Sequence, residues 1–325
     1  MELIRGEHNL RPRHRGCVAT IGNFDGVHLG HQTVLGQLAE KAAELDVPTT
    51  VIAFEPLPRE YFAGGRAPGR LTRLREKLQA LRRFSVDRVL VLRFDRRLAE
   101  MPAEGFIERI LVEGLGVRHL VVGDDFRFGR GREGDFHTLR EAGRRHGFTV
   151  AHMLTFDIDG VRVSSTRVRE ALAAGDLETA ARLLGRPYRM SGRVAHGDKR
   201  GRAIGFPTAN IRLARKVSPL QGVFAVELYG LEDEPLPGVA NVGTRPTVDG
   251  TEARLEVHLL DFDRDIYGRH VHVEFLRKIR EERRFESLEA LIRQIRRDVE
   301  AARGFFARQA SAREDTSPGR LRRRP

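Results

Sequence analysis

Short apolar runs alternate with longer amphipathic segments from residue 17 to about residue 184. The runs have the length and β-branched content of buried strands. The segments between them, such as residues 31–45 and 103–116, repeat apolar positions every three or four residues, as helices do. This alternation predicts a parallel sheet covered by helices. Because ligands bind at the carboxyl ends of parallel strands, we expect the chemistry to follow directly after the apolar runs.

The pattern changes after residue 184. Strand-like runs at residues 224–230, 253–260 and 270–276 are separated by Gly, Pro and Asp, with no helical segments between them. This predicts a small antiparallel barrel or sandwich. A final helical segment is expected to begin with Ser287 as its N-cap and to bury one apolar stripe: Leu288, Leu291, Ile292, Ile295 and Val299. We therefore predict domains at residues 1–184 and 185–308 and a disordered basic tail at residues 309–325.

Composition agrees with a soluble two-domain protein. The chain has 325 residues, of which 40% are apolar and 31% charged. No apolar run approaches the roughly 20 residues of a membrane span, and the charged N-terminus does not resemble a signal peptide. The single cysteine, Cys17, lies in an apolar run and suits a reducing compartment. We expect a cytoplasmic protein without a membrane partner.

The net charge of +12 raises nucleic-acid binding as an alternative. However, the basic residues are spread along the chain and mixed with 45 acidic residues, so a basic surface around polyphosphate substrates explains them as well. Only residues 320–325 form a basic cluster, which we interpret as a solvated tail rather than as a nucleic-acid arm.

The first candidate site is the segment IGNFDGVHLGH at residues 21–31, which ends a strand and opens a helix. Its glycines allow the backbone to approach a ligand, and a helix N-terminus attracts phosphate. His28 and His31 are three residues apart and can aim ring N–H groups at one polyphosphate. A metal pair is the alternative reading, but no third ligand with suitable spacing is evident. We favour phosphate recognition.

These residues resemble the HxGH signature of the nucleotidyltransferase superfamily, and the longer GNFDGVHLGH resembles the bacterial bifunctional riboflavin kinases/FAD synthetases. Residues 121–129 and 164–169 look like the second and third adenylyltransferase motifs of that family, in the expected order. The resemblance implies an α/β, Rossmann-like N-terminal domain that adenylylates FMN to FAD with release of pyrophosphate. The serines and threonine of residues 164–166 have a second reading, because Ser165 or Thr166 could simply cap the following helix.

The resemblance also implies roles for individual residues of this domain. His28 and His31 would be catalytic, stabilising the phosphates. Many family members have histidine where this chain has Leu57. Flavin contacts are implied for Pro56, Pro58, Phe62 and Phe128. ATP and phosphate contacts are implied for Gly22, Asn23, Phe24, Asp25, Gly30, Gly123, Asp125, Ser164, Ser165, Thr166 and Arg169.

The second candidate site is the glycine-rich stretch at residues 192–210, which does not match a P-loop but resembles the riboflavin kinase signature. In that signature, ATP would bind at Gly197, Lys199, Gly201, Gly205, Pro207, Thr208 and Asn210. Thr208 and Asn210 would also hold Mg²⁺, which prefers oxygen ligands. The resemblance thus implies a β-barrel riboflavin kinase domain with a C-terminal helix. This domain would phosphorylate riboflavin to FMN with ATP. For the whole chain, riboflavin, FMN and ATP would be substrates, with FMN and FAD as products rather than prosthetic groups.

Glu256 is the expected general base of the kinase. Alternation with Leu255 and Val257 puts it on the polar face of a strand, where it can project into a cleft. The resemblance makes it the base for the ribityl 5′-hydroxyl.

Competing readings are weaker. The sequence GRGREG at residues 129–134 matches a dinucleotide-binding pattern but does not open a βαβ unit. The HxGH residues also resemble class I aminoacyl-tRNA synthetases, but the chain lacks their lysine-rich loop. A nucleotidyltransferase with a degenerate second domain is disfavoured by the kinase residues Thr208, Asn210 and Glu256. A basic RNA-binding protein is disfavoured because the candidate residues are reactive groups at the ends of elements rather than a basic face with exposed aromatic residues.

Overall fold

The computed structural model describes residues 1–64, 67–123, 125–153, 156–197, 201, 204–215, 217–247 and 250–316. The chain divides into two compact units, one from Met1–Val168 and Leu183–Gly185 and the other from Arg169–Arg182 and Arg186 onward. Residues 169–182, which the sequence analysis assigns to the first domain, therefore pack with the second unit. The close approach of Gly175 to Lys278 illustrates this, since a Cβ at Gly175 would lie 2.2 Å from the Lys278 Cδ.

The first unit contains the predicted parallel sheet, in the order β1-β4-β3-β2-β5-β6. All five pairings in this sheet are parallel. The sequence analysis missed the edge strand β1. The strands are β1 (Glu2–Arg5), β2 (Cys17–Ile21), β3 (Thr49–Glu55), β4 (Arg88–Arg93), β5 (Val117–Gly123) and β6 (Thr149–Met153).

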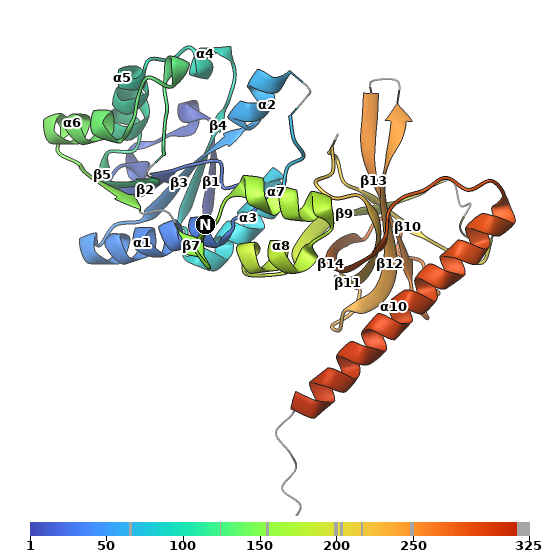
Figure 1. The fold of residues 1–325 in the computed structure, drawn as a ribbon. Coiled ribbons are helices and arrows are strands. Elements are labelled where there is room, and N and C mark those ends of the chain that lie inside the picture. The colour runs from blue at the N-terminus through green and yellow to red at the C-terminus, as the bar shows by residue number, and fades with distance from the viewer. Residues whose placement is uncertain are drawn as a thin grey trace, which may run out of the picture. The chain divides into compact units, whose positions relative to one another are not determined.

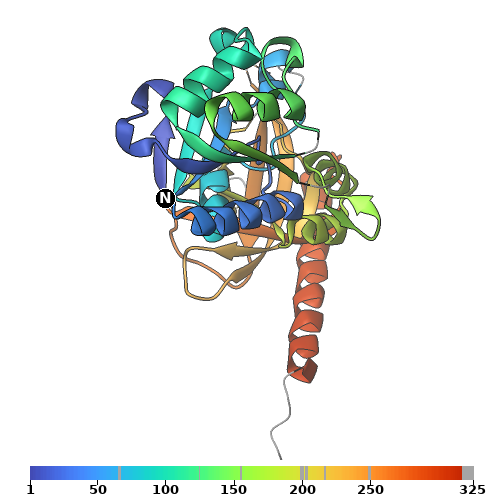
Figure 2. The same ribbon diagram turned by 90° about the vertical axis from the view of Figure 1, so that its left-hand side faces the viewer.

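Helices cover both faces of this sheet, as Figures 1 and 2 show. Alternation along β2 explains the two layers, because Cys17 and Ala19 belong to one apolar core and Val18 to the other. The Val18 face packs against α1 and α3, and the Cys17 face against α5, η4 and α6. The helices and turns are η1 (Glu7–Asn9), η2 (Pro12–His14), α1 (Leu29–Leu45), α2 (Pro58–Ala63), α3 (Leu74–Leu81), η3 (Arg82–Phe84), α4 (Arg96–Ala99), α5 (Ala103–Phe106), the π-helical η4 (Ile107–Gly114), η5 (Arg130–Arg132) and α6 (Phe136–His146).

The hairpin β7 (Asp157–Ile158) and β8 (Val161–Arg162) precedes α7 (Ser165–Ala174) and α8 (Leu177–Leu184). The second unit then forms a closed antiparallel barrel in the order β10-β13-β12-β11-β14-β9, which confirms the barrel rather than the sandwich. Along β13, Leu255 and Val257 are fully buried and Glu256 is not, so the predicted alternation is also confirmed. The strands are β9 (Tyr188–Ala195), β10 (Ala209–Arg212), β11 (Gly222–Tyr229), β12 (Leu236–Thr247), β13 (Gly250–Leu259) and β14 (His270–Arg280).

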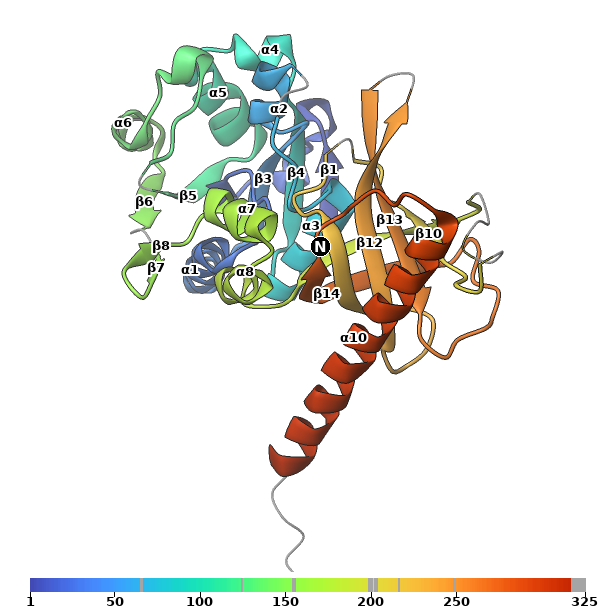
Figure 3. The same ribbon diagram turned by 45° about the vertical axis from the view of Figure 1, so that its right-hand side comes forward.

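The helix α10 (Leu288–Thr316) packs against the barrel strands β11, β12 and β14 (Figure 3). Its N-cap is the predicted Ser287, whose Oγ accepts from the Ala290 N–H at 3.1 Å. The helix continues past residue 308, so the prediction of disorder is wrong for residues 309–316, where the helix simply extends. Residues 317–325 lie outside the described residues. Within the described ranges, none of the helices combines the length and apolar character that crossing a bilayer requires.

Candidate active sites

A cavity of about 630 Å³ lies in the first unit, where β2 and β5 end and α1 and α7 begin. Most of the residues predicted for nucleotide binding meet here, although they come from four separate segments of the chain. They are Gly22, Asn23, Phe24, Asp25, His28, Gly30, His31, Pro58, Gly123, Asp125, Ser164, Ser165 and Thr166.

The two histidines are in contact at the first turn of α1. His28 is the N-cap, and its Nδ1 accepts from the His31 N–H at 3.3 Å. The two rings stack with centroids 3.7 Å apart. The His31 Nδ1 is buried without a hydrogen-bond partner in the described part of the chain. Burial, followed by the nearby His28 and Lys77, lowers the pKa of His31 well below its usual value, so this ring is neutral at pH 7.

The segment Ser164–Thr166 supplies a second helix N-terminus at the same cavity. Ser164, rather than the predicted Ser165 or Thr166, caps α7, since its Oγ accepts from the Arg167 N–H at 3.3 Å. The Ser165 hydroxyl instead donates to the Asp25 carbonyl oxygen at 2.9 Å. This bond ties the start of α7 to the loop between β2 and α1.

Asp25 is almost fully buried and organises the loop below the cavity. Its carboxylate accepts from the Arg59 guanidinium at 2.6 Å and from the backbone N–H groups of Leu71 and Thr72. The Thr72 hydroxyl in turn accepts from the Gly26 N–H at 2.9 Å. These bonds show that Asp25 holds three segments together.

Four residues predicted for this site do not line the cavity: Pro56, Phe62, Phe128 and Arg169. Phe128 is 8% exposed and packs in the core against Phe106, whereas its neighbour Phe126 lines the cavity. Phe62 is 70% exposed and lies edge-on to Tyr61 and Phe94.

The cavity also has lining residues that the sequence analysis missed, chiefly arginines and aromatic residues. The sequence could not single out these arginines as cavity residues, because the chain has 57 lysines and arginines. The additional residues include Arg59, Arg127, Arg132, Arg162, Phe54 and Phe126.

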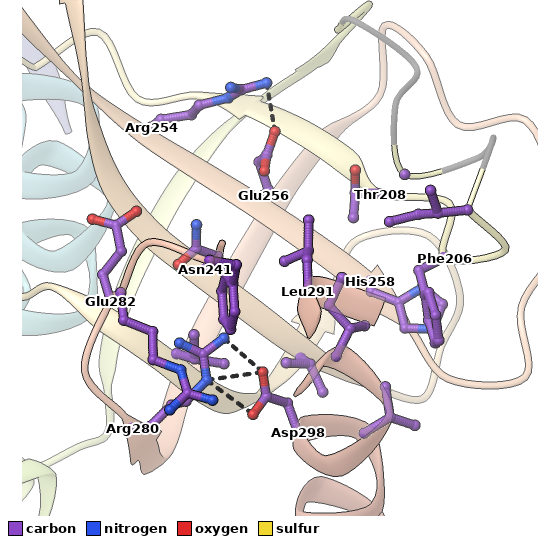
Figure 4. Close-up of a pocket in the computed structure, with 18 of the residues that line it drawn as sticks. Phe206, Thr208, Asn241, Arg254, Glu256, His258, Arg280, Glu282, Leu291 and Asp298 are labelled. Atoms are coloured by element: carbon purple, nitrogen blue, oxygen red, sulfur yellow. Dashed lines mark hydrogen bonds and ion pairs between the residues drawn. The ribbon is translucent and has the colours of Figure 1, made fainter. Parts of the chain in front are cut away.

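A second cavity, of about 340 Å³, lies in the barrel unit and is shown in Figure 4. It brings together Gly201, Thr208, Asn210 and Glu256, as the sequence analysis predicted. Arg254 connects two of these residues, because its guanidinium pairs with Glu256 Oε1 at 2.5 Å and donates to Asn210 Oδ1 at 3.0 Å. The carboxylate therefore lies beside a cation at the cavity wall.

Glycines shape the loop beside this cavity. A Cβ at Gly197 would lie 2.2 Å from the Asn210 amide nitrogen, and one at Gly201 would lie 2.4 Å from the Phe206 carbonyl oxygen. Gly205 has a φ of +84°, which favours glycine. Gly197, Gly205 and Pro207 do not line the main cavity, and Lys199 lies outside the described residues.

The barrel cavity also has aliphatic lining residues, three of them from α10, which the sequence analysis took only as a core helix. Leu291, Ile295 and Val299 lie here with Val223 and Val239. Below them, the Arg280 guanidinium binds the buried Asp298 carboxylate through bonds of 2.8–3.0 Å (Figure 4). The cavity lining thus combines polar and charged side chains with aliphatic ones that can contact a flat ring.

Two such cavities, one at the end of a parallel α/β sheet and one in a small barrel, define a two-site nucleotide-dependent transferase. Comparison with known proteins identifies which kind of transferase this is. The FAD synthetase family model matches residues 10–167, and the riboflavin kinase model matches residues 184–306. The chain belongs to the family of bifunctional riboflavin kinase/FMN adenylyltransferases.

Its similarity to individual proteins extends over nearly the whole chain. The bifunctional riboflavin kinase/FMN adenylyltransferase of Escherichia coli (strain K12) is 57% identical over 94% of this chain and 98% of its own length. That of Pseudomonas fluorescens is 56% identical over 95% and 99%. A crystal structure described as a macrolide-efflux protein from Streptococcus pneumoniae is similar with a TM-score of 0.77 and 29% identity, covering 93% of this chain and 99% of that one.

Proposed function

We propose that FMN is adenylylated in the cavity of the first unit and that riboflavin is phosphorylated in the cavity of the barrel. The observation that carries the first assignment is that two helix N-termini, those of α1 and α7, open into one cavity. Unpaired N–H groups and the positive ends of helix dipoles make such a place a polyphosphate site.

In the first cavity, a phosphate oxygen of FMN attacks the α-phosphorus of ATP. The bond from that phosphorus to the bridging oxygen breaks, and pyrophosphate leaves with the electron pair. His28 and His31 stabilise the negative charge that collects on the phosphates, and Ser164–Thr166 bind the departing end. The reaction needs little beyond alignment and charge stabilisation, since the nucleophile is already an oxyanion.

The flavin ring of FMN is proposed to lie at the aromatic side of the same cavity. Phe54, Pro58 and Phe126 line it there. The exposed Phe62 stands on α2, in the same helix as Pro58, and has an aromatic face available for stacking.

In the barrel cavity, Glu256 accepts the proton of the ribityl 5′-hydroxyl as its oxygen attacks the γ-phosphorus of ATP. The bond to the β-phosphate oxygen breaks, and ADP leaves. Glu256 lines the same cavity as Thr208 and Leu291 (Figure 4), and the flavin ring would bind against the aliphatic lining residues. The ion pair with Arg254 keeps the Glu256 carboxylate oriented.

Mg²⁺ is part of the proposal. The Thr208 hydroxyl and the Asn210 amide oxygen line the cavity and are the hard oxygen donors that this ion accepts. When bound there with the nucleotide, the ion would neutralise phosphate charge. No group of three or more His, Cys, Asp or Glu side chains suited to a metal occurs in the described ranges. We also infer a cytoplasmic enzyme, since ATP is consumed and Cys17 is a free thiol.

The test is incubation of the purified chain with riboflavin, ATP and Mg²⁺, with the flavins separated by chromatography over time. The proposal predicts that FMN appears first and FAD follows. Absence of both products would refute it, and FMN without FAD would refute the role of the first cavity.

A further inference from the structure

The loop at residues 128–134 carries the GRGREG pattern, which the sequence analysis discarded as a dinucleotide fingerprint. In the structure, the loop is closed at its base, where Phe128 and Gly134 exchange two backbone hydrogen bonds of 3.0 and 2.9 Å. It is also held from outside. The Arg130 N–H donates to the Met101 carbonyl oxygen at 2.8 Å, and the Glu133 carboxylate accepts from the Ala103 N–H at 2.8 Å.

Two glycines of the pattern are required by this packing. A Cβ at Gly129, whose φ is +76°, would lie 2.8 Å from the Ala103 Cα. One at Gly134 would lie 2.6 Å from the Phe128 ring. The pattern therefore encodes a tightly fixed loop beside the first cavity.

Arg132 has an unfavourable backbone conformation in this loop. Its φ is +64°, in the left-handed region that residues other than Gly, Asn and Asp seldom adopt. Such strain persists where surrounding bonds impose it and is concentrated at functional sites. Here the strained conformation belongs to a residue that lines the cavity.

The charge of Arg132 is also exceptional among the arginines that line this cavity. Arg59 is paired with Asp25, Arg127 with Asp135, and Arg162 with Asp125. In contrast, the Arg132 side chain forms no hydrogen bond or ion pair with any residue that the structure describes; only its backbone N–H is bonded, to Gly129. Since Arg132 lines the cavity proposed to hold the phosphates and has no carboxylate partner among the described residues, its guanidinium is placed to bind an anion.

We propose that Arg132 is a further substrate-binding residue, which contacts a phosphate group of one of the two substrates of FMN adenylylation. The inference rests on the proposed placement of that reaction in the first cavity. The shared chemistry is a phosphate oxyanion bound by a guanidinium, and separate titrations of FMN and of ATP distinguish which substrate supplies it.

The test compares Arg132→Asn with Arg130→Asn. Asparagine tolerates the left-handed backbone, so the first change removes the guanidinium with little effect on the loop. Arg130 is exposed in the same loop and does not line the cavity, which makes it the matched control. We expect Arg132→Asn to raise the KM for FMN or for ATP in FAD synthesis by about tenfold or more, since charge-assisted bonds are the strong ones. Arg132→Lys should fall between this variant and the wild type. Riboflavin phosphorylation should not change in any of them.

The inference would be overturned if Arg132→Asn and Arg130→Asn had the same kinetics of FAD synthesis. It would also be overturned if Arg132→Asn reduced riboflavin phosphorylation as much as it reduced FAD synthesis. His28→Ala is included to distinguish a failure of the role given to Arg132 from a failure of the proposal that FAD synthesis occurs in the first cavity. If it abolishes FAD synthesis and Arg132→Asn does not affect it, only the role of Arg132 fails. If neither change affects FAD synthesis, the placement of the reaction in this cavity fails as well.

Discussion

The rings of His28 and His31 stack with only 18° between their planes, while the Nδ1 of His28 accepts the backbone N–H of His31. One histidine therefore caps the helix and orients the other. The burial that this arrangement imposes lowers the pKa of His31 well below its usual value. Two positive rings in contact would repel each other, and the neutral form of His31 avoids this repulsion.

The lowered pKa of His31 predicts a pH-dependent stability. Below pH 6.5, the unfolded chain takes up a proton on His31 that the folded chain does not, so the folded state loses stability as the pH falls. We expect His31→Gln to remove part of this loss, at most about 1.4 kcal/mol per pH unit. Urea unfolding of the first unit at pH 7.5 and 5.5 measures it, with the exposed His137→Gln as control. Parallel pH profiles for wild type and His31→Gln would contradict the prediction.

Two glycines of α1 provide a matched pair of substitutions. A Cβ at Gly30 would lie 3.3 Å from the His28 ring, whereas one at Gly36 would meet nothing within 4 Å. Gly30→Ala should therefore displace the His28 ring and lower kcat/KM for FAD synthesis by about tenfold or more. Gly36→Ala should leave the kinetics unchanged and add about 0.5–1 kcal/mol of stability, because alanine is the better helix former. Equal kinetics for both variants would show that the His28 position is not critical.

Arg254 provides a test of the barrel site that leaves Glu256 in place. Its guanidinium contacts both Glu256 and Asn210, so Arg254→Leu should remove one positioning contact from each of these side chains. We expect kcat for riboflavin phosphorylation to fall by about tenfold, because the Glu256 carboxylate loses a contact that holds it in position. FAD synthesis from supplied FMN should not change. An unchanged kcat for riboflavin phosphorylation would show that Arg254 does not position Glu256.

Burial should determine how much each of two Arg–Asp pairs that involve α10 contributes to the free energy of unfolding. Arg280 binds the buried Asp298, whereas Arg303 binds the exposed Asp261. Asp298→Asn leaves a partly buried guanidinium without its partner and should cost about 3 kcal/mol of unfolding free energy. Asp261→Asn should change stability little, since surface pairs contribute little. Urea unfolding of both variants checks this, and similar losses would contradict the role given to burial.

Regular periodicity and ordered motifs explain what the sequence could predict. The strand alternation at Leu255 and Val257 and the N-cap at Ser287 depend on local patterns, and the structure confirms them. The expectation that His28 and Ser164 share a site came from the family resemblance, and both residues line the first cavity. The missed features depend on tertiary contacts. Nothing local distinguishes Arg132, or shows that Asp25 would hold Arg59 and Thr72 together.

Neighbouring residues also show that local sequence does not reveal tertiary contacts. Phe126 and Phe128 belong to one short motif. The bond from the Phe126 N–H to the Gly123 carbonyl oxygen and the bridge between Phe128 and Gly134 decide which of the two rings lines the cavity. The edge strand β1 is short and flanked by charged residues, so it lacks the pattern of a buried strand. The continuation of α10 to Thr316 involves a polar segment without an apolar stripe.

The most direct measurement of the central claim, that the two reactions occur at separate sites, is complementation between single variants. His28→Ala should convert riboflavin to FMN and stop there, and Glu256→Gln should make FAD only from supplied FMN. Mixed in one solution with riboflavin, ATP and Mg²⁺, the two variants should form FAD, because FMN released by the first is a substrate of the second. If Glu256→Gln still phosphorylates riboflavin, or if the mixture forms no FAD while each variant keeps its remaining activity, the division of labour proposed here is wrong.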